Sequence, residues 1–130
     1  MPITYTIDRA RKLILTRAWG VLSDDDLLQH KARLAGDPLA TPDMQELSDV
    51  REITQLAVTP KGVRALISHD DVRFEGGKQH RLAIVVPNDE VFGMARMYQT
   101  LGNDQPVQIF RDPALAEAWL LEGSWTEETT

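Results

Sequence analysis

The chain contains no cysteine, which excludes disulfides, thiol nucleophiles and thiolate metal sites. Positive charge is also scarce, since 14 lysine and arginine residues against 20 aspartate and glutamate residues leave a formal net charge of −6. Nucleic acids and anionic lipid surfaces are bound through clustered lysine and arginine. We therefore expect neither a nucleic-acid partner nor docking on an anionic membrane.

Long apolar runs are missing as well. The longest are short segments such as LAIVV from Leu82, far below the roughly 20 residues of a membrane-spanning helix. The N-terminal stretch MPITYTIDRARKLIL is interrupted by charges and has no apolar core of the kind found in a secretory signal. We expect a cytoplasmic protein without a membrane span, with one domain over 1–121 and a polar tail over 122–130 that is a candidate for disorder.

An antiparallel hairpin is predicted at the N-terminus. Ile3, Tyr5 and Ile7 alternate with polar residues, as in a strand with one buried face. A polar turn follows, and then a second strand over Leu13–Trp19 that is rich in β-branched and aromatic residues. Gly20 is expected to end this second strand.

Alternating strands and helices are predicted beyond the hairpin. Ser23 before three consecutive aspartates indicates a capped helix to about Ala35. The apolar run Arg81–Val86 predicts a strand that is buried on both faces and central in the sheet. The other expected elements are a strand over Gln45–Val50, a helix from Pro60 to near His69, a helix from Asn88 or Asp89 to about Leu101, a strand over Val107–Phe110 and a last helix after Asp112-Pro113.

This order defines the fold class. Repeated strand–helix crossovers imply mostly parallel pairing. We expect a single α/β domain with a mixed sheet of four to five strands, an antiparallel N-terminal hairpin and helices packed on the sheet.

Several segments together resemble a known family. They are Leu47–Arg51, Thr59–Leu66, Leu82–Pro87, Val91–Tyr98, Val107–Asp112 and Ala116–Leu120. On these residues the chain resembles the SpoIIAA-like (STAS/SEC14-type) domain family over nearly its whole length. The resemblance implies a four- or five-stranded mixed sheet with helices packed against it.

The resemblance also points to a candidate modification site. STAS proteins that antagonise anti-sigma factors carry a phosphorylatable serine, preceded by aspartate, at the start of the helix after the central strand. The comparable residues here are Val58-Thr59-Pro60, so the aspartate is missing and the acceptor would be Thr59. The alternative is that Thr59 only caps the helix.

Residues that could carry chemistry are few. The serines do not lie in a GxSxG turn, so nucleophilic catalysis has no support. His30, His69 and His80 lack the spacing of a metal site on one helix, and we expect neither a metal nor a cofactor. Lys31 falls within an apolar arc of its helix. Either its stem packs while the ammonium reaches water, or it anchors a ligand.

The helix after Asn88 carries the candidate interface or ligand face. Phe92 lies outside the core stripe of this helix and beside Arg96. An apolar side chain in that position is a candidate contact with a partner. The candidate face consists of Phe92, Met94, Arg96, Met97 and Tyr98.

Two functions are consistent with these patterns. The first is a non-enzymatic binding or regulatory module that acts through protein–protein interaction, either as a homodimer or with a regulatory protein. The alternative is a binder of a small apolar or lipid-like ligand in a cleft between the sheet and the helices, as the SEC14-type relationship suggests. The supply of large side chains at Phe92, Met94, Met97, Tyr98 and Trp119 motivates this alternative.

Overall fold

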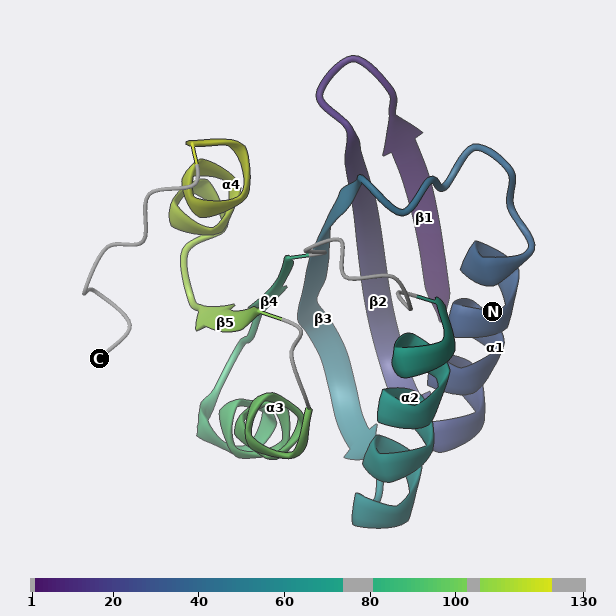
Figure 1. Ribbon diagram of the computed structural model, residues 1–130. Coiled ribbons are helices and arrows are strands. Elements are labelled where there is room, and N and C mark those ends of the chain that lie inside the picture. Colours follow the sequence, from purple (N-terminus) through teal and green to yellow (C-terminus); the bar gives the residue numbers. More distant parts are fainter. Residues whose placement is uncertain (1, 74–80, 103–105, 123–130) are drawn as a thin grey trace.

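The computed structural model describes residues 2–73, 81–102 and 106–122, with all their side chains except those of 69–73 and 122. Within these residues, five strands form one sheet in the order β1-β2-β3-β4-β5 (Figure 1). β1 and β2 pair antiparallel, and every other neighbouring pair is parallel. The strands are β1 (Ile3–Asp8), β2 (Leu13–Ser23), β3 (Gln45–Ala57), β4 (Leu82–Val85) and β5 (Val107–Phe110). The predicted mixed sheet with an N-terminal hairpin is confirmed.

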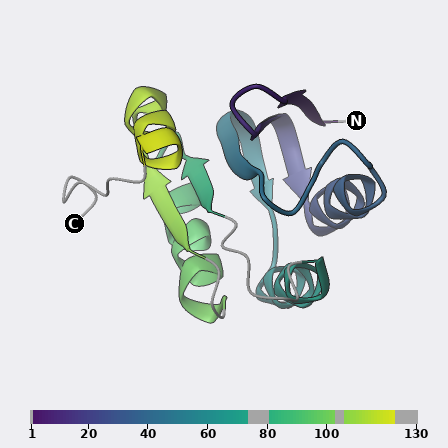
Figure 2. The same ribbon diagram turned by 45° about the horizontal axis from the view of Figure 1, so that its top comes forward.

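Helices cover both faces of the sheet (Figure 2). α1 (Asp24–Ala35), α2 (Pro60–Arg73) and α3 (Asp89–Leu101) pack on one face, and α4 (Pro113–Glu122) packs on the other. The alternation along β4 separates the two layers, because Leu82 belongs to the core under α2 and α3 whereas Ala83 and Val85 belong to the core under α4. As predicted, β4 is buried on both faces.

The hairpin strand β2 is longer than predicted. Gly20 does not end it: the strand continues to Ser23, and Gly20 adopts a φ of +68° inside it. The register with β3 shifts between Arg17 and Trp19 and again between Gly20 and Val21. Such irregularities bend a strand without ending its pairing, and glycine tolerates the positive φ.

The strand β3 is also longer than the predicted Gln45–Val50, because it runs on to Ala57. The extended β2 supplies a parallel partner up to the pair Ser23 and Ala57, so the backbone groups of the polar second half of β3 have hydrogen-bonding partners. The strand order places β3 in the middle of the sheet, so the prediction that β4 is the central strand is wrong. β4 lies between β3 and β5.

The helix starts follow their capping residues. The Ser23 side chain accepts a hydrogen bond from the backbone of Asp26, and the Asp26 side chain accepts one from the backbone of Ser23, which completes a capping box for α1. Asn88 caps α3 through the backbone N–H of Val91.

α2 runs to Arg73, beyond the predicted end near His69. In the part of the chain that the structure describes, no helix has the length and apolar character to cross a membrane.

Candidate functional site

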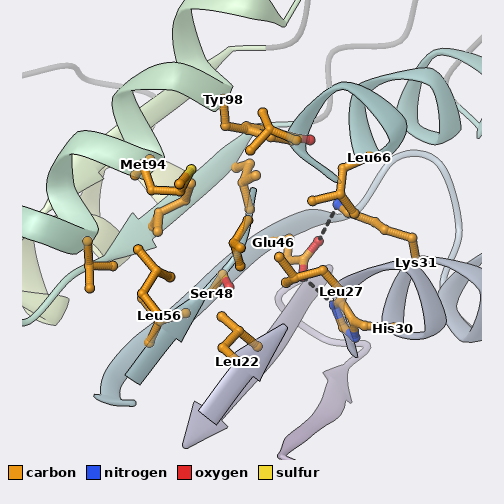
Figure 3. Close-up of a pocket in the computed structure, with 17 residues that line it drawn as sticks. Leu22, Leu27, His30, Lys31, Glu46, Ser48, Leu56, Leu66, Met94 and Tyr98 are labelled. Carbon is orange, nitrogen blue, oxygen red and sulfur yellow. Dashed lines mark hydrogen bonds and ion pairs between the residues drawn. The ribbon is translucent and has the colours of Figure 1, made fainter. Parts of the chain in front are cut away.

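A cavity of about 100 Å³ lies between the sheet and α1, α2 and α3 (Figure 3). Protein interiors are normally close-packed, with few voids larger than a water molecule, so a space of this size is a candidate binding site. Most of its wall is aliphatic and comes from three strands and three helices. Leu22, Leu27, Leu56, Leu66, Ile84 and Met94 are among the lining residues.

Polar side chains also reach this cavity. His30 and Lys31 come from α1, Glu46 and Ser48 from β3, and Tyr98 from α3. In Figure 3, His30, Lys31 and Glu46 lie together on one side of the cavity, across from Met94 and Leu56. The pocket therefore has an aliphatic body and a polar end.

Glu46 is the centre of the polar end. Only 2% of the residue is exposed, and burying a carboxylate is costly unless hydrogen bonds compensate for the lost water. The Thr16 hydroxyl donates to Oε2 of Glu46 at 2.7 Å, and Nε2 of His30 lies 3.1 Å from the same oxygen. These two partners from β2 and α1 join the helix to the sheet through one buried oxygen.

The geometry also assigns the ring proton of a neutral His30. A carboxylate oxygen only accepts hydrogen bonds, so Nε2 of His30 carries the hydrogen that Glu46 accepts. Nδ1 is buried and has no hydrogen-bond partner among the described residues. Among the described residues, the His30 ring is therefore hydrogen-bonded through Nε2 and not through Nδ1.

This cluster differs from a nucleophilic triad. In a triad the histidine lies between the hydroxyl and the carboxylate and uses one ring nitrogen for each. Here the Thr16 hydroxyl donates directly to Glu46, and both partners approach the same nitrogen of His30, with Thr16 at a long 3.5 Å. The arrangement does not activate Thr16 as a nucleophile.

Lys31 turns toward the same carboxylate from the other side. Its Nζ lies 3.9 Å from Oε1 of Glu46, and its side chain is 10% exposed. The sequence left two interpretations of Lys31 open. The interpretation in which its ammonium reaches water does not fit this position beside Glu46. The separation exceeds the roughly 2.7–2.9 Å of a direct charge-assisted hydrogen bond, so Lys31 and Glu46 form a long ion pair at the pocket wall.

The five residues of the predicted face on α3 do not all lie in the same surroundings. Met94 and Tyr98 line the pocket. Phe92 and Met97 are half-buried and pack against the same core, so the expectation that Phe92 lies outside it is wrong. The Arg111 guanidinium also covers the Phe92 ring at 5.4 Å from its centroid. Arg96 is exposed, and an interface role for this face stays a prediction.

Thr59 caps α2. Its hydroxyl oxygen accepts a hydrogen bond from the backbone N–H of Gly62 at 3.1 Å, and the hydroxyl donates to Oδ2 of Asp24 at 2.5 Å. The backbone N–H of Thr59 donates to Oδ1 of the same aspartate at 2.8 Å. Phosphorylation of Thr59 would remove the hydroxyl hydrogen that Asp24 accepts and would place the phosphate charge beside the Asp24 carboxylate. Phosphorylation of Thr59 stays a prediction.

Metal binding was not expected from the sequence. Among the described side chains, no group of three or more histidine, aspartate or glutamate residues could hold an ion. The side chains of His69 and His80 lie outside the described residues, so the expectation for them is neither supported nor contradicted.

Glu46, Thr16 and the role of His30 were not predicted from the sequence. A signal was present, because strand alternation places Glu46 and Ser48 on the same face as Val50, which is apolar. His30 likewise follows Leu27 by three residues, on the apolar side of α1. A polar residue on an apolar face was the sign of a buried polar cluster.

Comparison with known proteins supports the fold alone. No protein-family model and no curated protein matches the chain. A crystal structure of an uncharacterised protein from the DUF3478 family with a SpoIIAA-like fold, from Shewanella loihica PV-4, is similar, with a TM-score of 0.58 and 22% sequence identity over 91% of this chain and 93% of that chain. The chain has a SpoIIAA-like fold, as the resemblance implied.

Proposed function

We propose that this protein binds a small, largely apolar molecule in the pocket under α1, α2 and α3, and that it acts by binding rather than by catalysis. The observation that carries the proposal is the cavity of about 100 Å³. A ligand that fills this space gains van der Waals contacts with the side chains of its wall, which are individually small and collectively large.

The chemistry of the wall agrees with such a ligand. Binding sites for small molecules are mostly apolar, with a few polar groups that set the orientation. Here the aliphatic side chains supply the apolar body, and Lys31 and Glu46 supply the polar end. The pocket is small, so the ligand has few heavy atoms.

The proposal is tested by filling the cavity. Ala95 lines the pocket and is 7% exposed, so Ala95→Leu places additional carbon atoms in the cavity. Ala114→Leu is the matched control, because Ala114 is exposed on α4 at the opposite face of the sheet. Native mass spectrometry of protein purified from cells, and ligand-observed NMR with toluene as an apolar probe, measure binding.

We expect wild type and Ala114→Leu to bind toluene saturably, and Ala95→Leu to lose that binding while staying folded. Bound mass retained from cells in wild type, and lost in Ala95→Leu, would extend the result to a cellular ligand. A wild-type protein that does not bind toluene, or an Ala95→Leu variant that binds it as wild type does, would overturn the proposal.

A protein partner is the second candidate, either a second copy or a regulatory protein of the cytoplasm. It is favoured by Leu101, which is 43% exposed at the end of α3. Size-exclusion chromatography with light scattering on wild type, Phe92→Asp and Arg96→Glu tests it. Arg96→Glu is included because Phe92 is half-buried and its replacement also perturbs the core. A monomer at every concentration, unchanged in both variants, would count against the dimer.

A further inference from the structure

Ser48 is a half-buried polar residue on the sheet side of the pocket. It lies on β3 between Glu46 and Val50, at alternating positions whose side chains all line the pocket. In Figure 3, Ser48 lies between Glu46 and Leu56. The Ser48 side chain therefore stands where the polar end of the pocket meets its aliphatic body.

The fold makes no use of the Ser48 hydroxyl. Its neighbours on the adjacent strands are Thr16 and Ile84, but the Thr16 hydroxyl donates to Glu46 and Ile84 is apolar. Among the described residues, Oγ of Ser48 has no hydrogen-bond partner. In that part of the chain, Nδ1 of His30 is the one fully buried side-chain polar atom without a partner. Oγ of Ser48 is thus not sealed in the interior but open to the cavity that the residue lines.

We infer that Ser48 recognises the ligand of this pocket, and that this ligand is a small neutral molecule whose carbonyl oxygen accepts a hydrogen bond from the Ser48 hydroxyl. This assignment rests on the proposed function and names the chemical class of its ligand. A mostly apolar pocket orients its ligand through a small number of polar groups. A hydroxyl that has no partner in the described part of the fold, beside an aliphatic wall, is such a group.

The charges at the pocket wall favour a neutral ligand. Lys31 and Glu46 already form an ion pair with each other, and Oε2 of Glu46 also accepts from Thr16. A charged ligand would find no free counter-charge among the described side chains that line the pocket. Because burying an unpaired charge is very costly, a neutral polar group is the one that this wall accommodates.

A carbonyl matches the Ser48 hydroxyl better than a second hydroxyl does. A hydroxyl and a carbonyl have one hydrogen between them and form one hydrogen bond, so that no donor is left over. Two hydroxyls have two hydrogens and again form one bond, so that one donor lacks an acceptor within the pair. A buried donor without an acceptor weakens binding by about fivefold or more.

Three small probes test the inference, and their size suits a cavity of about 100 Å³. They are acetone, isobutene, which has the same shape with a methylene group in place of the oxygen, and 2-propanol. Dissociation constants are measured by NMR titration of the full chain as wild type, Ser48→Ala and Ser68→Ala. Ser68→Ala is the matched control, because Ser68 is exposed on α2.

We expect Ser48→Ala to weaken acetone binding about two- to tenfold, as the net contribution of one neutral hydrogen bond predicts, and to leave isobutene binding unchanged. Wild type should bind acetone about fivefold more tightly than 2-propanol. Ser68→Ala should bind all three probes as wild type does. Because the Ser48 hydroxyl has no partner among the described residues, the melting temperature of Ser48→Ala without probes should equal or exceed that of wild type.

Several outcomes would overturn the inference and leave the proposed function in place. They are an acetone affinity that Ser48→Ala does not change, an equal loss of isobutene affinity, and a Ser48→Ala protein that melts below wild type. Binding of 2-propanol as tight as that of acetone would overturn the choice of a carbonyl. Failure of all three probes to bind wild type would overturn the proposed function together with the inference.

Discussion

The two faces of the sheet are packed in opposite ways. Under α4, Leu13, Ala83 and Val85 are fully buried, and the rings of Phe110 and Trp119 meet with centroids 5.9 Å apart. Under α1, α2 and α3 the core contains a cavity and a buried carboxylate. One face is an apolar contact between a single helix and the sheet, whereas the other combines an apolar core with a polar cluster.

The difference follows from how each face is covered. A single helix can lay its apolar side directly on β3, β4 and β5, and Arg81 closes that layer by donating from Nη1 to the Trp119 carbonyl at 3.2 Å. On the other face three helices share the sheet, and α2 contacts both α1 and α3. The cavity lies between these helices and the sheet. The α4 face is thus closely packed, whereas a cavity remains under the three helices of the other face.

The largest expected effect comes from breaking the α4 face. Trp119→Ala removes the side chain that packs on Phe110, and we expect the free energy of unfolding to fall by about 3–5 kcal/mol. Leu121→Ala, at a residue that is 45% exposed on the same helix, is the control and should change little. Urea denaturation followed by circular dichroism measures both, and a loss below about 1 kcal/mol for Trp119→Ala would contradict the close packing of this face.

Enlarging an alanine on each face compares the two directly. Ala83 is fully buried under α4, so Ala83→Leu should cost about 1–3 kcal/mol through overpacking. Ala95→Leu fills the cavity instead and should cost less than about 0.5 kcal/mol, or stabilise the fold. Equal losses in the free energy of unfolding for the two variants, in the same denaturation experiment, would contradict the difference in packing between the two faces.

The polar cluster makes a smaller contribution. Thr16→Val keeps the shape of the side chain and removes the hydroxyl that donates to Glu46 at 2.7 Å. Because a buried acceptor then loses a partner, we expect a cost of about 1–2 kcal/mol. Thr54→Val, at an exposed position of β3, is the matched control. If both variants had the same stability, the hydrogen bond to Glu46 would not contribute to folding.

The smallest effect is expected at the surface, away from both cores. The Thr41 hydroxyl and the Lys12 ammonium lower the pKa of the exposed Asp43 from 3.8 to about 2. A lowered pKa means that the stabilisation is present above the ordinary pKa and is lost as the pH falls through about 2. The difference in melting temperature between wild type and Asp43→Asn should therefore narrow between about pH 4 and pH 2. A difference independent of pH would show that the ion pair is not its source.

Local sequence patterns determined most of the elements and their order. Capping residues such as Ser23 and Asn88 predicted where helices start, because a side-chain cap and its helix are neighbours in the chain. Strand ends were less predictable. β2 passes through Gly20, and β3 continues to Ala57, because each strand is extended by pairing with the other, and pairing is not a local property.

The candidate site depended on tertiary structure. Periodicity alone placed Lys31 in an apolar arc and Phe92 outside the core stripe, but the packed neighbours decided that Lys31 faces Glu46 and that Phe92 lies against the core under Arg111. Thr16 and Glu46 are 30 residues apart in the chain and meet at one oxygen. By itself the sequence determined which face of each element is apolar, since this follows from local spacing. Only the packing of three helices on one sheet decided where a cavity remains and which polar groups line it, because that depends on how distant faces fit together.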